Sequence, residues 1–169
     1  MDAFTYLAMI KVVLIITLVF LAYIDLRSFQ LPDVITLPMI AVGIIFNAVG
    51  TPPYTGLANP ISSLLGAITG FTLLWALDKM YYWTKKQHGI GLGDAKLLSA
   101  LGAWLGMNSI PNILLIASIS GALGGVLWLR YQKQTIQSAF PFGPFLVFAG
   151  IIELLWPQQL QALILNSPT

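Results

Sequence analysis

The sequence predicts an all-α, polytopic integral membrane protein. Of its 169 residues, 57% are hydrophobic and only 8% are charged, whereas a typical soluble domain has roughly 25% charged residues. Apolar stretches recur along the whole chain, and several approach the roughly 20 residues that a helix needs to cross a bilayer core. With no cysteine and a single histidine, disulfides, Cys-ligated zinc and a His-rich metal site are excluded. We therefore expect a single membrane-embedded domain over residues 1–169, with no cofactor or metal.

Six membrane-spanning helices are predicted, and the first three have clear borders. Residues 4–24 form an apolar segment with no small-residue cleavage site after it, so we expect a retained helix rather than a signal peptide. Residues 34–49 lie between Pro32 and the pair Pro52-Pro53. Residues 61–77 follow Asn59-Pro60, a pair typical of a helix start.

The last three predicted helices are also bounded by Gly and Pro. Residues 95–108 follow a glycine-rich stretch, and with Asp94 included they rise only about 22 Å, which is short of a full crossing. Residues 113–129 follow Pro111, and residues 142–156 begin between Pro141 and Pro144. Residues 158–165 are expected to form either a short helix on the membrane surface or a frayed end of the last span.

The basic residues predict the orientation, because Lys and Arg accumulate in loops that stay in the cytoplasm. Of the eight Lys and Arg residues, all except Lys11 lie on the side of the membrane where the first span ends. We therefore expect both termini on the outer side, with Lys11 reaching the outer surface along its aliphatic stem. Tyr81, Tyr82 and Trp83 are expected to form an aromatic belt at the cytoplasmic boundary.

Two of the six carboxylates stand at the cytoplasmic ends of predicted helices. Asp25 ends the first span, and Asp94 follows a run in which residues 89, 91 and 93 are glycines. Ionisable groups at membrane depth are costly and therefore suggest function. The glycines remove side chains where a peptide would approach, and they permit positive φ angles. The alternatives are that Asp94 merely caps its helix and that Asp25 pairs with Arg27 or another base.

Two carboxylates that meet in a low-dielectric site share one proton, because both cannot ionise cheaply. The charged carboxylate can accept a proton from a water molecule that attacks a peptide carbonyl. The protonated carboxyl can meanwhile donate a hydrogen bond to the carbonyl oxygen. Such a pair titrates as a unit, so the sequence does not assign the proton to either aspartate.

Three blocks of the sequence resemble the type IV prepilin peptidase family, membrane aspartyl proteases with a GxGD motif. The blocks are residues 25–38, residues 91–106 with Gly91-Leu92-Gly93-Asp94 at their start, and residues 141–145 (Pro-Phe-Gly-Pro-Phe). The resemblance implies that Asp25 and Asp94 are catalytic. Residues expected to support the site or the substrate are Pro32, Asp33, Gly91, Gly93 and Lys96.

Within that resemblance, two supporting residues have more specific expectations. Asp33 is expected to be an auxiliary polar or helix-capping residue. Lys96 is expected to steady the local charge or to meet lipid phosphates.

The resemblance also implies a substrate and a location. The substrate would be a prepilin or pseudopilin precursor of a type IV pilus or type II secretion system, cut at the cytoplasmic face of the bacterial inner membrane, typically after a glycine. The precursor and membrane lipids are the expected partners, and no nucleic acid is expected. Larger family members carry an N-terminal segment with paired CxxC motifs and N-methylate the product. The sequence, which has no cysteine, favours peptidase activity alone.

Two other functions remain open from the sequence. A presenilin-like intramembrane protease also uses GxGD, but the Pro-Ala-Leu motif of such enzymes is absent from this sequence. A non-catalytic membrane scaffold or a transporter subunit would use the aspartates for packing or for ion passage.

Overall fold

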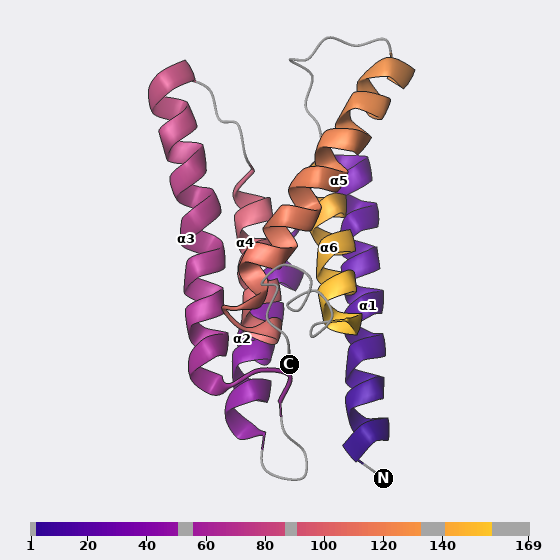
Figure 1. Ribbon diagram of the computed structural model, residues 1–169, viewed down its shortest axis with the longest axis vertical. Coiled ribbons are helices and arrows are strands. Elements are labelled where there is room, and N and C mark those ends of the chain that lie inside the picture. The colour runs from indigo at the N-terminus through magenta and orange to yellow at the C-terminus, as the bar shows by residue number, and fades with distance from the viewer. Residues whose placement is uncertain (1–2, 51–55, 87–90, 133–140, 157–169) are drawn as a thin grey trace, which may run out of the picture.

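The computed structural model describes residues 3–50, 56–86, 91–132 and 141–156, and these residues form α-helices and no strand (Figure 1). Each predicted span overlaps one helix, so the all-α class is confirmed. The helices are α1 (Ala3–Ser28), α2 (Asp33–Val49), α3 (Pro60–Lys85), α4 (Leu92–Leu105), α5 (Ser109–Gln132) and α6 (Gly143–Leu155). The first two residues and the predicted segment 158–165 lie outside the described residues.

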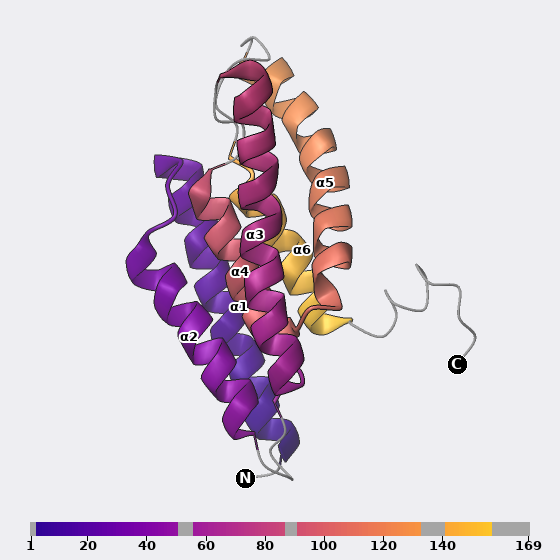
Figure 2. The same ribbon diagram turned by 90° about the vertical axis from the view of Figure 1, so that its left-hand side faces the viewer.

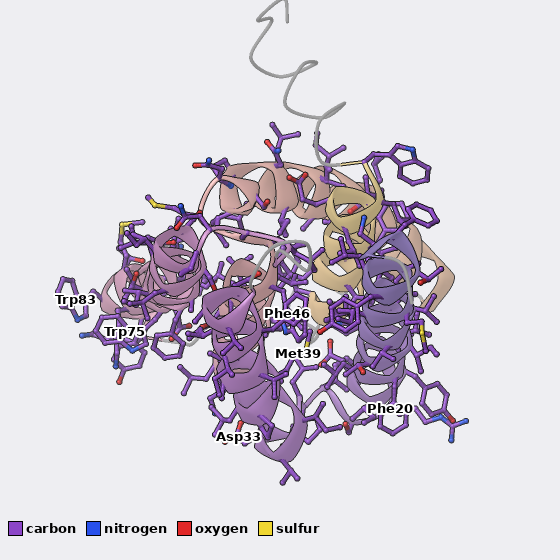
Figure 3. All side chains as sticks on the ribbon, turned by 90° about the horizontal axis from the view of Figure 1, so that it is seen from below. Phe20, Asp33, Met39, Phe46, Trp75 and Trp83 are labelled. Atoms are coloured by element: carbon purple, nitrogen blue, oxygen red, sulfur yellow. The ribbon has the colours of Figure 1, made fainter. Side chains whose placement is uncertain are left out.

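The outer surface of the bundle is apolar. Phe20 on α1 and Trp75 on α3 are 52% and 43% exposed, and both point away from the bundle (Figure 3). Segments Phe4–Ser28 and Pro60–Lys85 are long and apolar enough to cross a membrane, and α2, α6 and part of α5 are shorter apolar helices. Side chains of this kind are favoured where lipid replaces water as the solvent. The fold is that of a polytopic membrane protein.

One predicted border differs clearly from the structure. α3 ends at Lys85 rather than at residue 77, so Tyr81, Tyr82 and Trp83 lie on the helix itself. Hydropathy marks where the apolar stretch stops, but a helix ends only where its backbone hydrogen bonds end. Here the next residue, Lys86, is the C-cap and adopts the left-handed conformation with φ 56° that is common just after a helix.

Small residues bring α3 and α4 into backbone contact. A Cβ atom on Gly66 would collide with the carbonyl oxygen of Gly102, and a Cβ atom on Gly102 would collide with that of Gly66. The Ser63 hydroxyl donates a hydrogen bond to the Ala103 carbonyl at 2.5 Å, and the Ser99 hydroxyl donates one to the Ala67 carbonyl at 2.8 Å. Small side chains and interhelical hydrogen bonds are the usual means by which helices associate in membranes.

The C-terminal end of α4 is held by α2. The last carbonyls of a helix lack partners within that helix. Here the Asn47 side-chain amide donates to the carbonyls of Ala103 and Trp104, at 2.9 and 3.1 Å. The Trp104 indole N–H donates to the Met39 carbonyl at 2.9 Å. These contacts fix the position of α4, and with it the position of Asp94.

Helix α6 bridges the two sides of the bundle. It packs against α1, α4 and α5, whereas α4 is also packed against α2 and α3. Gly150 lies against Leu101 of α4, where a Cβ atom would be 2.6 Å from a leucine methyl carbon. The backbones of α1 and α2 do not touch, and from below Met39 and Phe46 of α2 lie between the two helices (Figure 3). At the level of backbone packing, α1 is therefore linked to α4 through α6.

Candidate active site

The structure brings Asp25 and Asp94 into range of each other's charge. Asp25 lies in the last turns of α1 and is 5% exposed, and Asp94 lies in the first turn of α4 and is 9% exposed. In Figure 1, α4 and α6 begin below the upper ends of α3 and α5, and the two views agree on this offset (Figure 2). Because Asp25 is near the end of α1 and Asp94 is at the start of α4, the two carboxyls are recessed below the upper ends of α3 and α5. Two acidic groups this close and this buried cannot both ionise cheaply.

Asp25 does not pair with Arg27. The Arg27 guanidinium instead lies over the Tyr23 ring, 4.9 Å from its centroid, and within the described part of the chain no ion pair reaches Asp25. The backbone N–H of Gly143, at the start of α6, faces the Asp25 carboxyl. The Oδ2 atom of Asp25 is buried without a hydrogen-bond partner among the described residues. The alternative of an interfacial pair with Arg27 is therefore wrong, and Oδ2 has a lone pair free to accept a proton.

Asp94 interacts with the N-terminus of its own helix. Gly91 is the N-cap residue of α4, with φ −70° and no side-chain cap, and its backbone N–H bonds to the Asp94 carboxyl. This contact matches the half of a capping box in which an acidic residue reaches back to the N-cap. Helix capping and proximity to Asp25 are therefore compatible roles of one side chain.

The glycines before Asp94 do not use positive φ angles. Among the described glycines, positive φ is found at Gly106, so this part of the expectation is wrong for Gly91 and Gly93, while residue 89 lies outside the described part. Gly91 is exposed, and a Cβ atom on it would lie 3.6 Å from Asp94 Oδ2, an ordinary contact distance. Gly93 permits close packing instead, because its Cβ atom would lie 3.1 Å from Leu31 Cβ.

Asp33 and Lys96 form an ion pair between the starts of α2 and α4. The Lys96 Nζ atom is 2.6 Å from Asp33 Oδ1, so the two charges are paired with each other. Asp33 does not cap α2, because the N-cap residue is Pro32 and no side-chain cap bond is present there. The Pro32 carbonyl accepts backbone hydrogen bonds from Ile35 and Thr36, each 3.1 Å long. The ion pair between Lys96 and Asp33 joins the starts of α2 and α4. Exposed ion pairs of this kind stabilise a fold by only about 0–1 kcal/mol.

The sequence interpretation did not single out Glu153, which is 0% exposed on α6. The Asn112 side-chain amide of α5 lies 3.3 Å from both Glu153 carboxyl oxygens, and Ser109 also bonds to this carboxyl. Glu153 lies near the C-terminal end of α6, opposite the end that faces Asp25. A signal was present, since Glu153 is flanked by Ile-Ile and Leu-Leu. Asp78 of α3, 3% exposed, was missed as well.

Glu153 is expected to stabilise the contact between α5 and α6. Glu153→Leu leaves the Asn112 amide buried without its acceptor, which costs about 1–3 kcal/mol. Glu153→Gln keeps an acceptor oxygen and nearly the same shape, so its thermal stability should remain close to that of the wild type. Thermal unfolding of both variants in detergent measures this difference. A leucine variant as stable as the wild type would show that the buried pair contributes nothing.

An apolar bundle with two buried aspartates at recessed helix ends is the arrangement of a membrane-embedded protein with an acidic site. Comparison with known proteins identifies the family. Residues 12–126 match the type IV leader peptidase family, and the chain belongs to that family. The resemblance noted from the three sequence blocks is thereby confirmed.

Curated relatives carry the name prepilin leader peptidase/N-methyltransferase. The Aeromonas hydrophila protein is 41% identical over 143 residues, which cover 82% of this chain and 46% of that protein. The Dickeya chrysanthemi protein is 38% identical, covering 80% and 46%, and the Pseudomonas aeruginosa protein is 36% identical, covering 93% and 52%. The chain thus spans about half the length of these relatives. No solved structure matches it.

Proposed function

We propose that this chain is an aspartic endopeptidase, a single membrane-embedded peptidase domain that removes the leader peptide from prepilin or pseudopilin-like precursors. The observation that carries the proposal is the burial of Asp25 and Asp94 within range of each other's charge. The site belongs to a chain of the type IV leader peptidase family, whose curated relatives are named prepilin leader peptidases.

The proposed reaction is hydrolysis of a peptide bond by the two carboxyls acting as base and acid. The ionised carboxylate takes a proton from a water molecule, whose oxygen then bonds to the scissile carbonyl carbon. The protonated carboxyl donates a hydrogen bond to the carbonyl oxygen and stabilises its developing charge. The carboxyl that took the proton from water then passes a proton to the nitrogen of the scissile bond. The carbon–nitrogen bond breaks, which releases the leader and exposes the new N-terminus.

The proposed location of the site is the cytoplasmic face of the bacterial inner membrane. Arg27 and Lys85 lie in the last turns of α1 and α3, at the end of the bundle where both aspartates lie. Basic residues favour the cytoplasmic side, which supports an outer location for both termini. A compartment reporter fused after Thr169 should give an outer signal, and a cytoplasmic signal would reverse the orientation.

An apolar groove between α1 and α2 supports entry of the substrate from the lipid. The groove is a cavity of about 590 Å³. On α1, Leu14 lines it, and Leu21 and Asp25 follow at helical spacing on the same side of the helix. We propose that the apolar helix of the precursor lies in this groove, with the leader junction at Asp25. The lining residues are Tyr6, Met9, Ile10, Val13, Leu14, Thr17, Val34, Ile35, Pro38, Met39, Val42 and Trp104.

Filling the groove should weaken substrate binding without changing the chemistry. Thr17→Trp places a bulky ring among the lining residues and should raise KM roughly tenfold with little change in kcat, the pattern expected when uniform binding is lost. Val19→Trp is the matched control, because Val19 lies on the opposite side of α1 and is 53% exposed. Steady-state cleavage of a precursor in nanodiscs measures both constants. Equal KM values for the two variants would argue against this route.

The experiment that tests the proposed function is cleavage of a prepilin-type precursor by the chain reconstituted in nanodiscs. Mass spectrometry should show a product that has lost its leader, with a new N-terminus after the leader's last residue. We expect the product to be unmethylated when a methyl donor is present, and a methylated product would contradict peptidase activity alone. A precursor that stays intact would refute the proposed function and favour a scaffold or transporter role.

A further inference from the structure

The third sequence block, Pro-Phe-Gly-Pro-Phe at residues 141–145, has no role in the reaction described so far. The structure places its glycine directly against the candidate site. A Cβ atom on Gly143 would lie 2.5 Å from Oδ2 of Asp25 and 3.0 Å from its Cγ. Any residue other than glycine would therefore take up the space that the Asp25 carboxyl now fills.

One backbone amide at the start of α6 is available to donate to the Asp25 carboxyl. The first N–H groups of a helix have no partner within it, and here Pro144 has no N–H at all. The N–H groups of Phe145 and Leu146 donate to the Phe142 carbonyl, at 3.0 and 3.2 Å. The N–H of Gly143 remains, and it faces the Asp25 carboxyl. A helix N-terminus with a free amide favours the negatively charged form of a nearby carboxyl.

The two phenylalanines of the block anchor this helix start to α5. A Cβ atom on Gly121 would lie 3.2 Å from the Phe142 ring, and one on Gly124 would collide with the Phe145 ring. Both rings therefore lie directly on glycines of α5. With Gly150 against Leu101 of α4, these contacts fix the start of α6 relative to the candidate site.

We propose that Gly143 is a positioning residue for the reaction, which holds the Asp25 carboxyl against the N-terminus of α6 and within range of Asp94. The proposal rests on the proposed function for its effect on activity. The contact between Gly143 and Asp25 is a property of the fold and can be tested without a substrate. In this arrangement the aromatic residues of the block anchor the helix, and Gly143, as the first residue of α6, keeps an amide free of the helix and receives the carboxyl.

The kinetic test compares Gly143→Ala with the wild type on a prepilin-type precursor in nanodiscs. Displacing a carboxyl from its preorganised donor should lower kcat at least about tenfold, with KM changing less than about threefold. Gly50→Ala is the matched control, because Gly50 is exposed at the end of α2 with φ −55°. Unchanged kcat in Gly143→Ala, or an increase in KM alone, would overturn the proposal.

The stability test uses a double-mutant cycle that needs no substrate. Gly143→Ala should lower Tm in the wild-type background because the added methyl group displaces the Asp25 carboxyl. In an Asp25→Ala background the carboxyl is gone, so the same substitution should lower Tm by less than half as much. Equal losses in both backgrounds would overturn the contact. If the wild-type chain cleaves no precursor, the proposed function fails, and the cycle still decides whether Gly143 positions Asp25.

Discussion

Asp25→Asn and Asp94→Asn should each abolish processing of a prepilin-type precursor. Each substitution keeps the shape of the side chain but removes either the base or the acid of the proposed pair. General acid–base catalysis contributes roughly 10²- to 10⁴-fold to a rate, so kcat should fall by at least that range. Because the two carboxyls act as a unit, the double variant should be little worse than either single one. Precursor size on a gel and initial rates in nanodiscs measure the loss.

Glu153→Gln is the matched control for these variants. It removes a buried carboxyl from the same bundle, but near the C-terminal end of α6, away from Asp25. Its processing rate should stay near that of the wild type. Full processing by either aspartate variant would rule out the two-carboxyl mechanism. Loss of processing in all three variants would show that the fold is sensitive to the removal of any buried carboxyl.

Gly66→Ala and Gly102→Ala should have the largest effect on stability. A methyl group at either position would collide with a carbonyl oxygen of the facing helix, and backbone atoms cannot rotate aside as a side chain can. Overpacking a tight contact costs about 1–3 kcal/mol, and the upper part of that range is expected here. Processing should fall as well, because α4 carries Asp94. Thermal unfolding in detergent together with the cleavage rate measures both effects.

Ala76→Leu is the control on the same helix. Ala76 is exposed on α3, where added apolar volume meets lipid rather than a neighbouring helix. This variant adds more atoms than either glycine substitution and should still unfold close to the wild-type temperature. If all three variants are equally stable, α3 and α4 do not depend on close backbone contact.

The sequence alone determined which segments are helices and which acidic residues to consider. Hydropathy identifies segments that prefer lipid, and Pro and Gly mark most of their ends, because both signals are local. The glycine-rich run before Asp94 and the block around Asp25 identified the candidate pair. The length of α3 was wrong beyond residue 77, since hydropathy detects the end of an apolar stretch and not the end of a helix.

Only the tertiary structure decided what surrounds those acidic residues. It placed Arg27 over Tyr23 rather than beside Asp25, and it joined Lys96 to Asp33 and Asn112 to Glu153. It also brought Gly143 against Asp25. These partners are far apart in the chain or compete with nearer ones. The contacts between different helices depend on how closely the helix backbones approach, which is set by small residues on several helices at once and by no local pattern.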